Sequence, residues 1–127
     1  MAKTRSDEHA LAIHSIIMIR LWGGVLEHPA GSQLWKAMNL PLPGQRDIYG
    51  GWTLCIDQNW FGHRAEKRTF LYIVGINPKE IPSYPIMGIV SSNIEKMGRP
   101  EREHTPKKLA EWLIKLVNLC NSKKLLY

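Results

Sequence analysis

The beginning of the chain has the hydrophobic pattern of a helix. Ser6 offers a hydroxyl that can cap a helix N-terminus, and two acidic residues follow it, where they interact favourably with the helix dipole. Gly23 and Gly24 supply the backbone freedom with which the helix can end. Because the apolar surface between these points is broad, we expect other elements to cover most of the helix. Its apolar residues recur at helical spacing and include Ala10, Ile13, Ile16, Ile17, Ile19, Leu21 and Trp22.

Three later segments have the pattern of β-strands. Residues 25–28 form a short strand that Pro29 ends. In residues 52–57 apolar and smaller or polar side chains alternate, which is strand periodicity. Residues 70–74 are nearly all apolar, which is typical of a central strand that is covered on both faces. We therefore predict a sheet with residues 70–74 in its interior and the first strand parallel to its neighbours.

The other segments are connections and helices. We predict a short helix in residues 32–38 and a loop from there to Gly50–Gly51. Residues 75–106 contain five prolines and little periodicity, so this long connection is either functional or mobile, and a short strand at residues 86–90 is one alternative. Thr105 and Pro106 suit the start of a last helix. The apolar face of that helix contains Leu109, Trp112, Leu113, Leu116, Val117 and Cys120.

The order of these elements predicts one α/β domain that spans residues 1–127. We expect a small sheet of roughly three to five strands with flanking helices, arranged in two or three layers. The chain has the length of one compact domain with one core, and neither an internal repeat nor a second domain boundary is visible.

The composition restricts the partners and the compartment. The chain has 17 Lys plus Arg against 11 Asp plus Glu, a net charge of +6, which is compatible with a polyanionic partner such as DNA but is also common in small proteins. Cys55 and Cys120 have no spacing that indicates a disulfide framework, and the histidines have none that indicates a metal site. With neither a signal peptide nor an apolar run that could span a bilayer, we expect a cytoplasmic protein that does not bind membranes.

One segment combines aromatic and basic residues in the way that suits phosphate contact and base stacking. The alternative is a buried aromatic anchor followed by a solvated basic turn. Arg64 is the strongest candidate within this segment. A second basic segment (Lys96, Arg99, Arg102, Lys107 and Lys108) is either a solvated face or a nucleic-acid patch. The candidate nucleic-acid or partner-binding residues of the first segment are Trp60, His63, Arg64, Lys67 and Arg68.

Two stretches resemble DNA cytosine methyltransferases. Residues 24–29, Gly-Val-Leu-Glu-His-Pro, are similar to the strand that ends in Glu-Asn-Pro or Glu-Asn-Val in those enzymes, and residues 61–75 resemble a later block in which a basic loop leads into a strand ending in Val-Gly. The whole chain is also similar to the C-terminal portion of uncharacterised bacteriophage and prophage proteins, which carry a Gly-Gly-Val-Leu-Glu-His-Pro segment and a Glu-Arg-Glu-His-Thr-Pro segment, here residues 101–106. The resemblance implies a truncated methyltransferase-like (Rossmann-like) sheet.

The resemblance also implies a binding site at Glu27 and His28. A carboxylate at the end of a parallel strand could pair with the Watson–Crick edge of a flipped base, whereas the alternative is an ion pair or a helix cap. The family has asparagine where this chain has His28. Neither a Pro-Pro-Cys segment nor a G-x-G-x-x-G turn occurs, and Cys55 lies mid-strand, so we expect no catalytic residues in this chain. S-adenosylmethionine would bind only if a partner chain supplied its site.

Three functions remain open at this stage. The first is a phage or prophage DNA-modification-related module that binds DNA without catalysing a reaction alone. The second is a counter-defence inhibitor that binds a host protein. The third is a subunit of a split DNA methyltransferase, whose activity would appear on mixing and be lost with Glu27→Gln. The strand bearing Val25 lacks the neighbours of the full fold, so we expect a homodimer, a partner chain or a rearranged edge to cover it.

Overall fold

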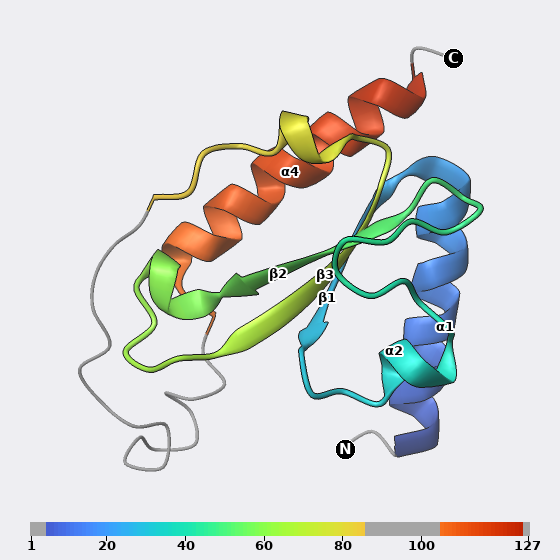
Figure 1. The fold of residues 1–127 in the computed structure, drawn as a ribbon, viewed down its shortest axis with the longest axis horizontal. Coiled ribbons are helices and arrows are strands. Elements are labelled where there is room, and N and C mark those ends of the chain that lie inside the picture. Colours follow the sequence, from blue (N-terminus) through green and yellow to red (C-terminus); the bar gives the residue numbers. More distant parts are fainter. Residues whose placement is uncertain (1–4, 86–104, 126–127) are drawn as a thin grey trace.

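The computed structural model describes residues 5–85 and 105–125, with side chains described for residues 10–85 and 105–121. Three strands form one sheet, and helices lie on both of its sides (Figure 1). In the described residues no helix is both long and apolar enough to cross a membrane. The elements are α1 (Arg5–Trp22), β1 (Gly24–Pro29), α2 (Leu34–Ala37), β2 (Trp52–Asp57), η1 (Gln58–Phe61), β3 (Arg68–Val74), η2 (Pro78–Glu80) and α4 (Lys107–Leu125).

The sheet has the order β1-β3-β2, and both strand pairs are antiparallel. The prediction that the last strand is central is confirmed, but the predicted parallel arrangement is wrong. A strand buried on both faces has a continuous apolar sequence whatever the direction of its neighbours, so the pattern of β3 could not fix direction. Residues 58–67 between β2 and β3 form a compact turn, which reverses the chain and makes these strands antiparallel neighbours. The structure is therefore a small mixed α/β protein with a three-stranded antiparallel sheet.

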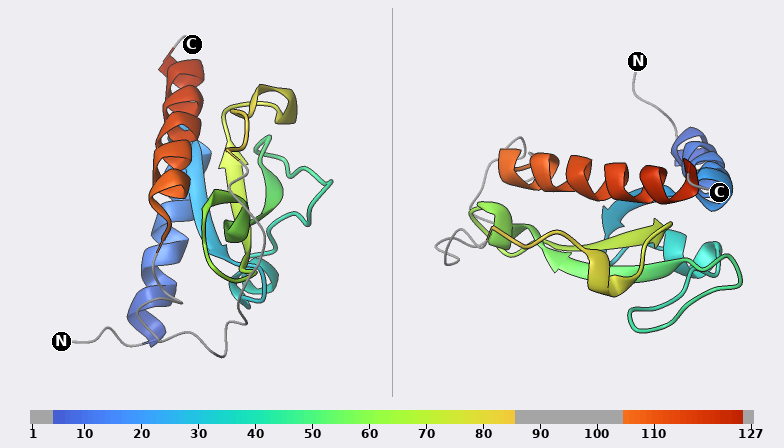
Figure 2. Two further views of the ribbon diagram at one scale, coloured as in Figure 1. Left: turned by 90° about the vertical axis from the view of Figure 1, so that its left-hand side faces the viewer. Right: turned by 90° about the horizontal axis from the view of Figure 1, so that it is seen from above.

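Alternate side chains of β3 belong to two separate hydrophobic clusters. Leu71 and Ile73 face α4, and this cluster includes Trp52 of β2. Tyr72 and Val74 face the other way and pack with residues of α1, α2 and the following loop. This alternation follows from the two-residue period of a strand. Figure 2 shows the resulting arrangement, with α4 along one side of the sheet and α2 on the other.

The last helix has the predicted buried face. Leu109, Trp112, Leu116 and Cys120 are all buried against the sheet, while Leu113 is half-buried. Gly75 permits the close approach of β3 to this helix, because a Cβ atom at Gly75 would lie 2.9 Å from the carbonyl oxygen of Cys120. The predicted strand at residues 86–90 and the basic residues Lys96, Arg99 and Arg102 lie outside the described residues.

The prediction that other elements cover most of α1 is wrong. The residues of α1 that face the core are Ala12, Ile16 and Ile19. Within the predicted stripe, Ile17 and Leu21 are exposed. The helix is apolar on two sides, and the sheet and α2 cover one of them.

Three buried indole groups form hydrogen bonds between separate elements. Trp35 Nε1 donates to Thr53 Oγ1 at 3.0 Å, which holds α2 against β2. Trp52 Nε1 donates to the carbonyl of Ile76 at 2.8 Å, and Trp112 Nε1 donates to the carbonyl of Pro82 at 3.0 Å. A buried indole stabilises a fold when its N–H has such a partner. These bonds hold the segment after β3 against α4 and β2.

Candidate nucleic-acid interface

The connection between β2 and β3 is a structured turn. Asp57 Oδ1 accepts hydrogen bonds from the backbone amides of Asn59 and Lys67, both at 2.9 Å, so one carboxylate ties the two ends of the connection together. Asn59 Nδ2 donates to the carbonyl of His63 at 2.8 Å. Gly62 has φ of 104°, a left-handed conformation that closes the 3-10 turn η1 and favours glycine. The side chains that follow are therefore held on a defined backbone.

The aromatic and imidazole side chains of this connection lie inward. Phe61 is fully buried, and its ring centroid is 5.3 Å from that of Trp112 in α4. Trp60 is half-buried and packs edge-on against Tyr84. His63 is buried, and its Nδ1 lies 2.9 Å from the carbonyl oxygen of Ala65 and 3.2 Å from its amide nitrogen. These placements agree with the alternative of a buried aromatic anchor followed by a basic turn, in which Trp60 and His63 shape the loop.

The basic side chains of the same connection lie outward. Arg64 and Arg68 are exposed, and Lys67 is half-buried. The first turn of α4 packs beside η1, so the exposed Lys107 and Lys108 extend the same surface (Figure 1). Lys108 Nζ lies 4.0 Å from the Glu111 carboxylate, an exposed pair that leaves much of its charge accessible to an anion. We call Arg64, Lys67, Arg68, Lys107 and Lys108 the basic end.

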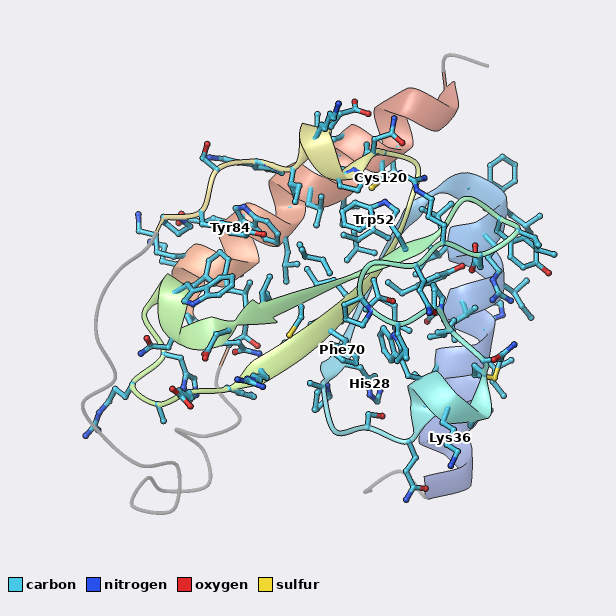
Figure 3. The ribbon with its side chains drawn as sticks, in the orientation of Figure 1. His28, Lys36, Trp52, Phe70, Tyr84 and Cys120 are labelled. Atoms are coloured by element: carbon cyan, nitrogen blue, oxygen red, sulfur yellow. The ribbon has the colours of Figure 1, made fainter. Side chains whose placement is uncertain are left out.

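Glu27 and His28 follow each other in β1 and therefore face opposite sides of the sheet. Glu27 is opposite Leu71 on the face toward α4, and it is half-buried. His28 is opposite Phe70 on the other face, near the end of the strand (Figure 3). The two predicted binding residues are thus adjacent along the chain but do not converge on one ligand.

His28 has local partners that explain its position. Its Nδ1 lies 2.8 Å from Ser32 Oγ, and this hydroxyl also accepts from the amide of Leu34 at 3.2 Å, at the start of α2. Its ring centroid is 6.5 Å from that of Trp35. These contacts connect the end of β1 to α2 and make His28 part of the packing.

The strand register brings the predicted residues to one end of the sheet. Pro29 is opposite Thr69, and Asp57 is opposite Arg68, so the ends of β1 and β2 both meet the start of β3. The amide of Ala30 also donates to the carbonyl of Arg68 at 3.1 Å. The antiparallel sheet therefore places the end of β1 and the basic turn at the same end of the sheet, although β1 and β2 are its opposite edges and Glu27 and His28 face opposite sides of it.

A second polar cluster, which no sequence pattern indicated, lies at α1 and the loop before β2. Asp47 accepts a hydrogen bond from the Tyr72 hydroxyl and lies 3.7 Å from the guanidinium of Arg20, which also donates to that hydroxyl at 3.2 Å. Arg20 stacks over the ring of Tyr49, with its Cζ 4.2 Å from the ring centroid. Burial is the largest cause that raises the pKa of Tyr72, to about 12, and the carboxylate of Asp47 adds to the effect.

This cluster borders a cavity of about 670 Å³ that the loop residues line. The charges of Arg20 and Asp47 balance each other and hold the loop, while Arg46, which also lines the cavity, donates to Asn77 Oδ1 at 2.9 Å. Asp47 Oδ1 also accepts from the amides of Tyr49 and Gly51, at 3.0 and 2.8 Å. The sequence signal that could have found it is an aspartate shortly before Gly50–Gly51, which is typical of a side chain that caps a turn.

The described residues contain no group of three or more His, Cys, Asp or Glu side chains that could hold a metal ion. Cys120 is fully buried, and burial raises the pKa of its thiol to about 11, which disfavours the thiolate needed for nucleophilic attack. Cys55 is half-buried in β2. What the arrangement offers chemically is a surface of basic side chains on a fixed turn.

Comparisons of the chain with protein-family models, with curated proteins and with solved structures gave no significant match.

Proposed function

We propose that this chain is a DNA-binding module that attaches to the phosphate backbone through the basic end and catalyses no reaction alone. The observation that carries this proposal is the placement of Arg64 and Lys67 on a structured turn, and of Arg68 at the start of β3, beside the lysines that begin α4. Basic side chains that are grouped on a fixed surface neutralise neighbouring phosphates and release counterions, which drives binding to DNA.

Two proposals rest on the two methyltransferase-like segments of the sequence. One is a role in phage or prophage DNA modification, and the other is a relationship to a truncated methyltransferase fold. In this proposal the chain supplies DNA contacts, and any S-adenosylmethionine site would belong to a partner chain. The resemblance would make Glu27 the contact to a base; this residue is half-buried in β1, opposite Leu71 in the middle of β3.

Fluorescence anisotropy of labelled duplex DNA, titrated with the protein across a salt series, tests the proposal. Five phosphate contacts predict a slope of log affinity against log salt of about −4.5, and a loss of affinity of roughly several hundred-fold between about 50 and about 200 mM salt. Changing Arg64, Lys67 and Arg68 to Gln should reduce the magnitude of the slope to about 2, because each lost phosphate contact removes about one unit.

A matched variant separates this site from the effect of net charge. Lys36, Lys79 and Lys115 are exposed and lie in α2, η2 and the middle of α4, outside the basic end. Changing these three to Gln lowers the charge by the same amount and should leave most of the affinity and of the salt slope. The proposal would be refuted if the two triple variants lost the same amount of DNA affinity and salt slope, or if the unmodified chain did not bind DNA at low salt.

A further inference from the structure

Helix α1 carries a second apolar face, turned away from the core. Ala12, Ile16 and Ile19 face the sheet and are buried. On the opposite side large apolar side chains are exposed between residues 11 and 22. We call them the outer face of α1; they are Leu11 (48% exposed), Ile17 (50%), Met18 (42%), Leu21 (60%) and Trp22 (63%).

The spacing along this face suits contact with another helix. Leu11, His14, Met18 and Leu21 are separated by three, four and three residues, which is the spacing of the seam at which two helices pack together. Trp22 lies beside this seam and supplies the largest apolar side chain. One continuous strip of a helix can pair with an identical strip across a two-fold axis, because such an interface uses the same surface on both subunits.

The charge distribution favours a second copy of this chain as the partner. The chain as a whole has a net charge of +6, so two copies carry a net repulsion that an interface without like charges reduces. Between residues 9 and 22, Arg20 is the one Lys, Arg, Asp or Glu, and its guanidinium lies 3.7 Å from the Asp47 carboxylate. Two outer faces can therefore approach each other without bringing like charges together.

The exposed area reaches what a stable dimer needs. A fully exposed aliphatic or aromatic side chain presents on the order of 100 to 250 Å², so the outer face exposes roughly 500 Å² of apolar surface. Two copies would bury about 1,000 Å² through α1 alone, which is the lower limit of a specific interface. Apolar patches of this size mark interaction sites.

We infer that two copies of this chain associate through the outer face of α1, with the helices paired about a two-fold axis. The inference is independent of DNA binding, since the basic end lies elsewhere on the molecule (Figure 1). Association covers Leu21 and Trp22, the most exposed members of the face.

Sedimentation velocity of the full chain, without DNA, over a micromolar range of concentration tests the inference. The unmodified chain should shift from monomer to dimer within this range. The double variant Met18→Lys with Leu21→Lys places two charges on each outer face and should weaken the dimer by more than about thirty-fold, the effect of losing interface residues worth 2 kcal/mol or more. Both side chains are exposed, so circular dichroism and the urea midpoint should remain close to those of the unmodified chain.

The control is the double variant Ile114→Lys with Leu119→Lys, which adds the same charge to exposed apolar positions of α4. It should dimerise like the unmodified chain. The inference is overturned if the unmodified chain stays monomeric throughout, or if the two double variants weaken association equally. A monomer that floats with phospholipid vesicles, and loses this property in the α1 variant alone, would also overturn it and would identify a lipid surface as the occupant.

Discussion

Removing the hydroxyl of Tyr72 tests how the loop before β2 is held. In Tyr72→Phe the Oδ2 of Asp47 loses the hydrogen bond from the Tyr72 hydroxyl, and the Nε of Arg20 loses the same hydroxyl as its acceptor at 3.2 Å. The side chains of Arg20 and Asp47 are 20% and 14% exposed, so water replaces these bonds only in part. A hydrogen bond to a charged group contributes about 1.5 to 3 kcal/mol, and we expect the free energy of unfolding to fall by about 2 kcal/mol.

Alkaline pH provides a second measurement of the same interaction. The pKa of Tyr72 is raised to about 12, first by burial and then by Asp47, whereas the pKa of an unfolded tyrosine is near 10. A raised pKa means that the neutral hydroxyl stabilises the folded state. This contribution is fully present below pH 10, is lost as pH rises through about 12, and amounts to at most about 3 kcal/mol. The stability difference between the unmodified chain and Tyr72→Phe should therefore shrink over this window.

Urea unfolding followed by tryptophan fluorescence, at pH 8 and at steps from pH 9 to pH 12, measures both effects. Tyr49→Phe is the matched control, because it keeps the aromatic ring beside Arg20 and removes only the hydroxyl of a half-exposed side chain. This variant should lose no more than about 0.5 kcal/mol of the free energy of unfolding. The reasoning is refuted if Tyr72→Phe is as stable as the control at pH 8. It is also refuted if the difference in stability stays constant up to pH 12.

Two further predictions concern the contact between β3 and α4. Gly75→Ala should lower the free energy of unfolding by about 2 to 4 kcal/mol, because it combines a positive φ of 119° with a Cβ 2.9 Å from the Cys120 carbonyl oxygen. The control is Gly44→Ala, which also has a positive φ but no atom within 4 Å of its Cβ. It should lower the free energy of unfolding by only about 1 to 2 kcal/mol in the same urea assay. Burial raises the pKa of the Cys120 thiol to about 11, so this thiol should resist a thiol reagent at pH 8. The Cys55→Ser variant should therefore show no reactive thiol when folded and one reactive thiol in urea. Rapid labelling of the folded variant would contradict the burial of Cys120.

The sequence was sufficient for the elements whose pattern depends on local spacing. The strand at residues 52–57 and the buried face of α4 were predicted because the period of two and the period of 3.6 are properties of one segment. Direction in the sheet depends on how separate segments meet, and the apolar run of β3 is the same beside parallel or antiparallel neighbours. The breadth of the apolar surface of α1 was read correctly, but a sequence does not say whether this chain or another one covers it.

In the candidate site too, the sequence predicted the properties of single residues but not those that depend on the fold. The basic character of Arg64, Lys67 and Arg68 is a property of the residues, and in the structure Arg64 and Arg68 are exposed while Lys67 is half-buried. The burial of His63 depends on hydrogen bonds within the turn, made to Ala65 and Asn59, which the interleaved aromatic and basic pattern does not reveal. The convergence of this turn with the end of β1 depends on the register of β3, which pairs with both other strands.

The two proposed surfaces make different demands on the molecule and can be separated. Figures 1 and 2 place η1 and the start of α4 at one end of the long axis and α1 at the other, so pairing through α1 leaves both basic ends uncovered. A dimer would then present two basic ends, and binding of one end to a duplex would raise the effective concentration of the second. The variant Met18→Lys with Leu21→Lys should therefore retain the contacts of a single basic end and bind a short duplex about as the unmodified chain does. It should bind a long duplex more weakly than the unmodified chain, because it lacks the second basic end of the dimer. If that variant bound long and short duplexes in the same ratio as the unmodified chain, the two surfaces would act independently.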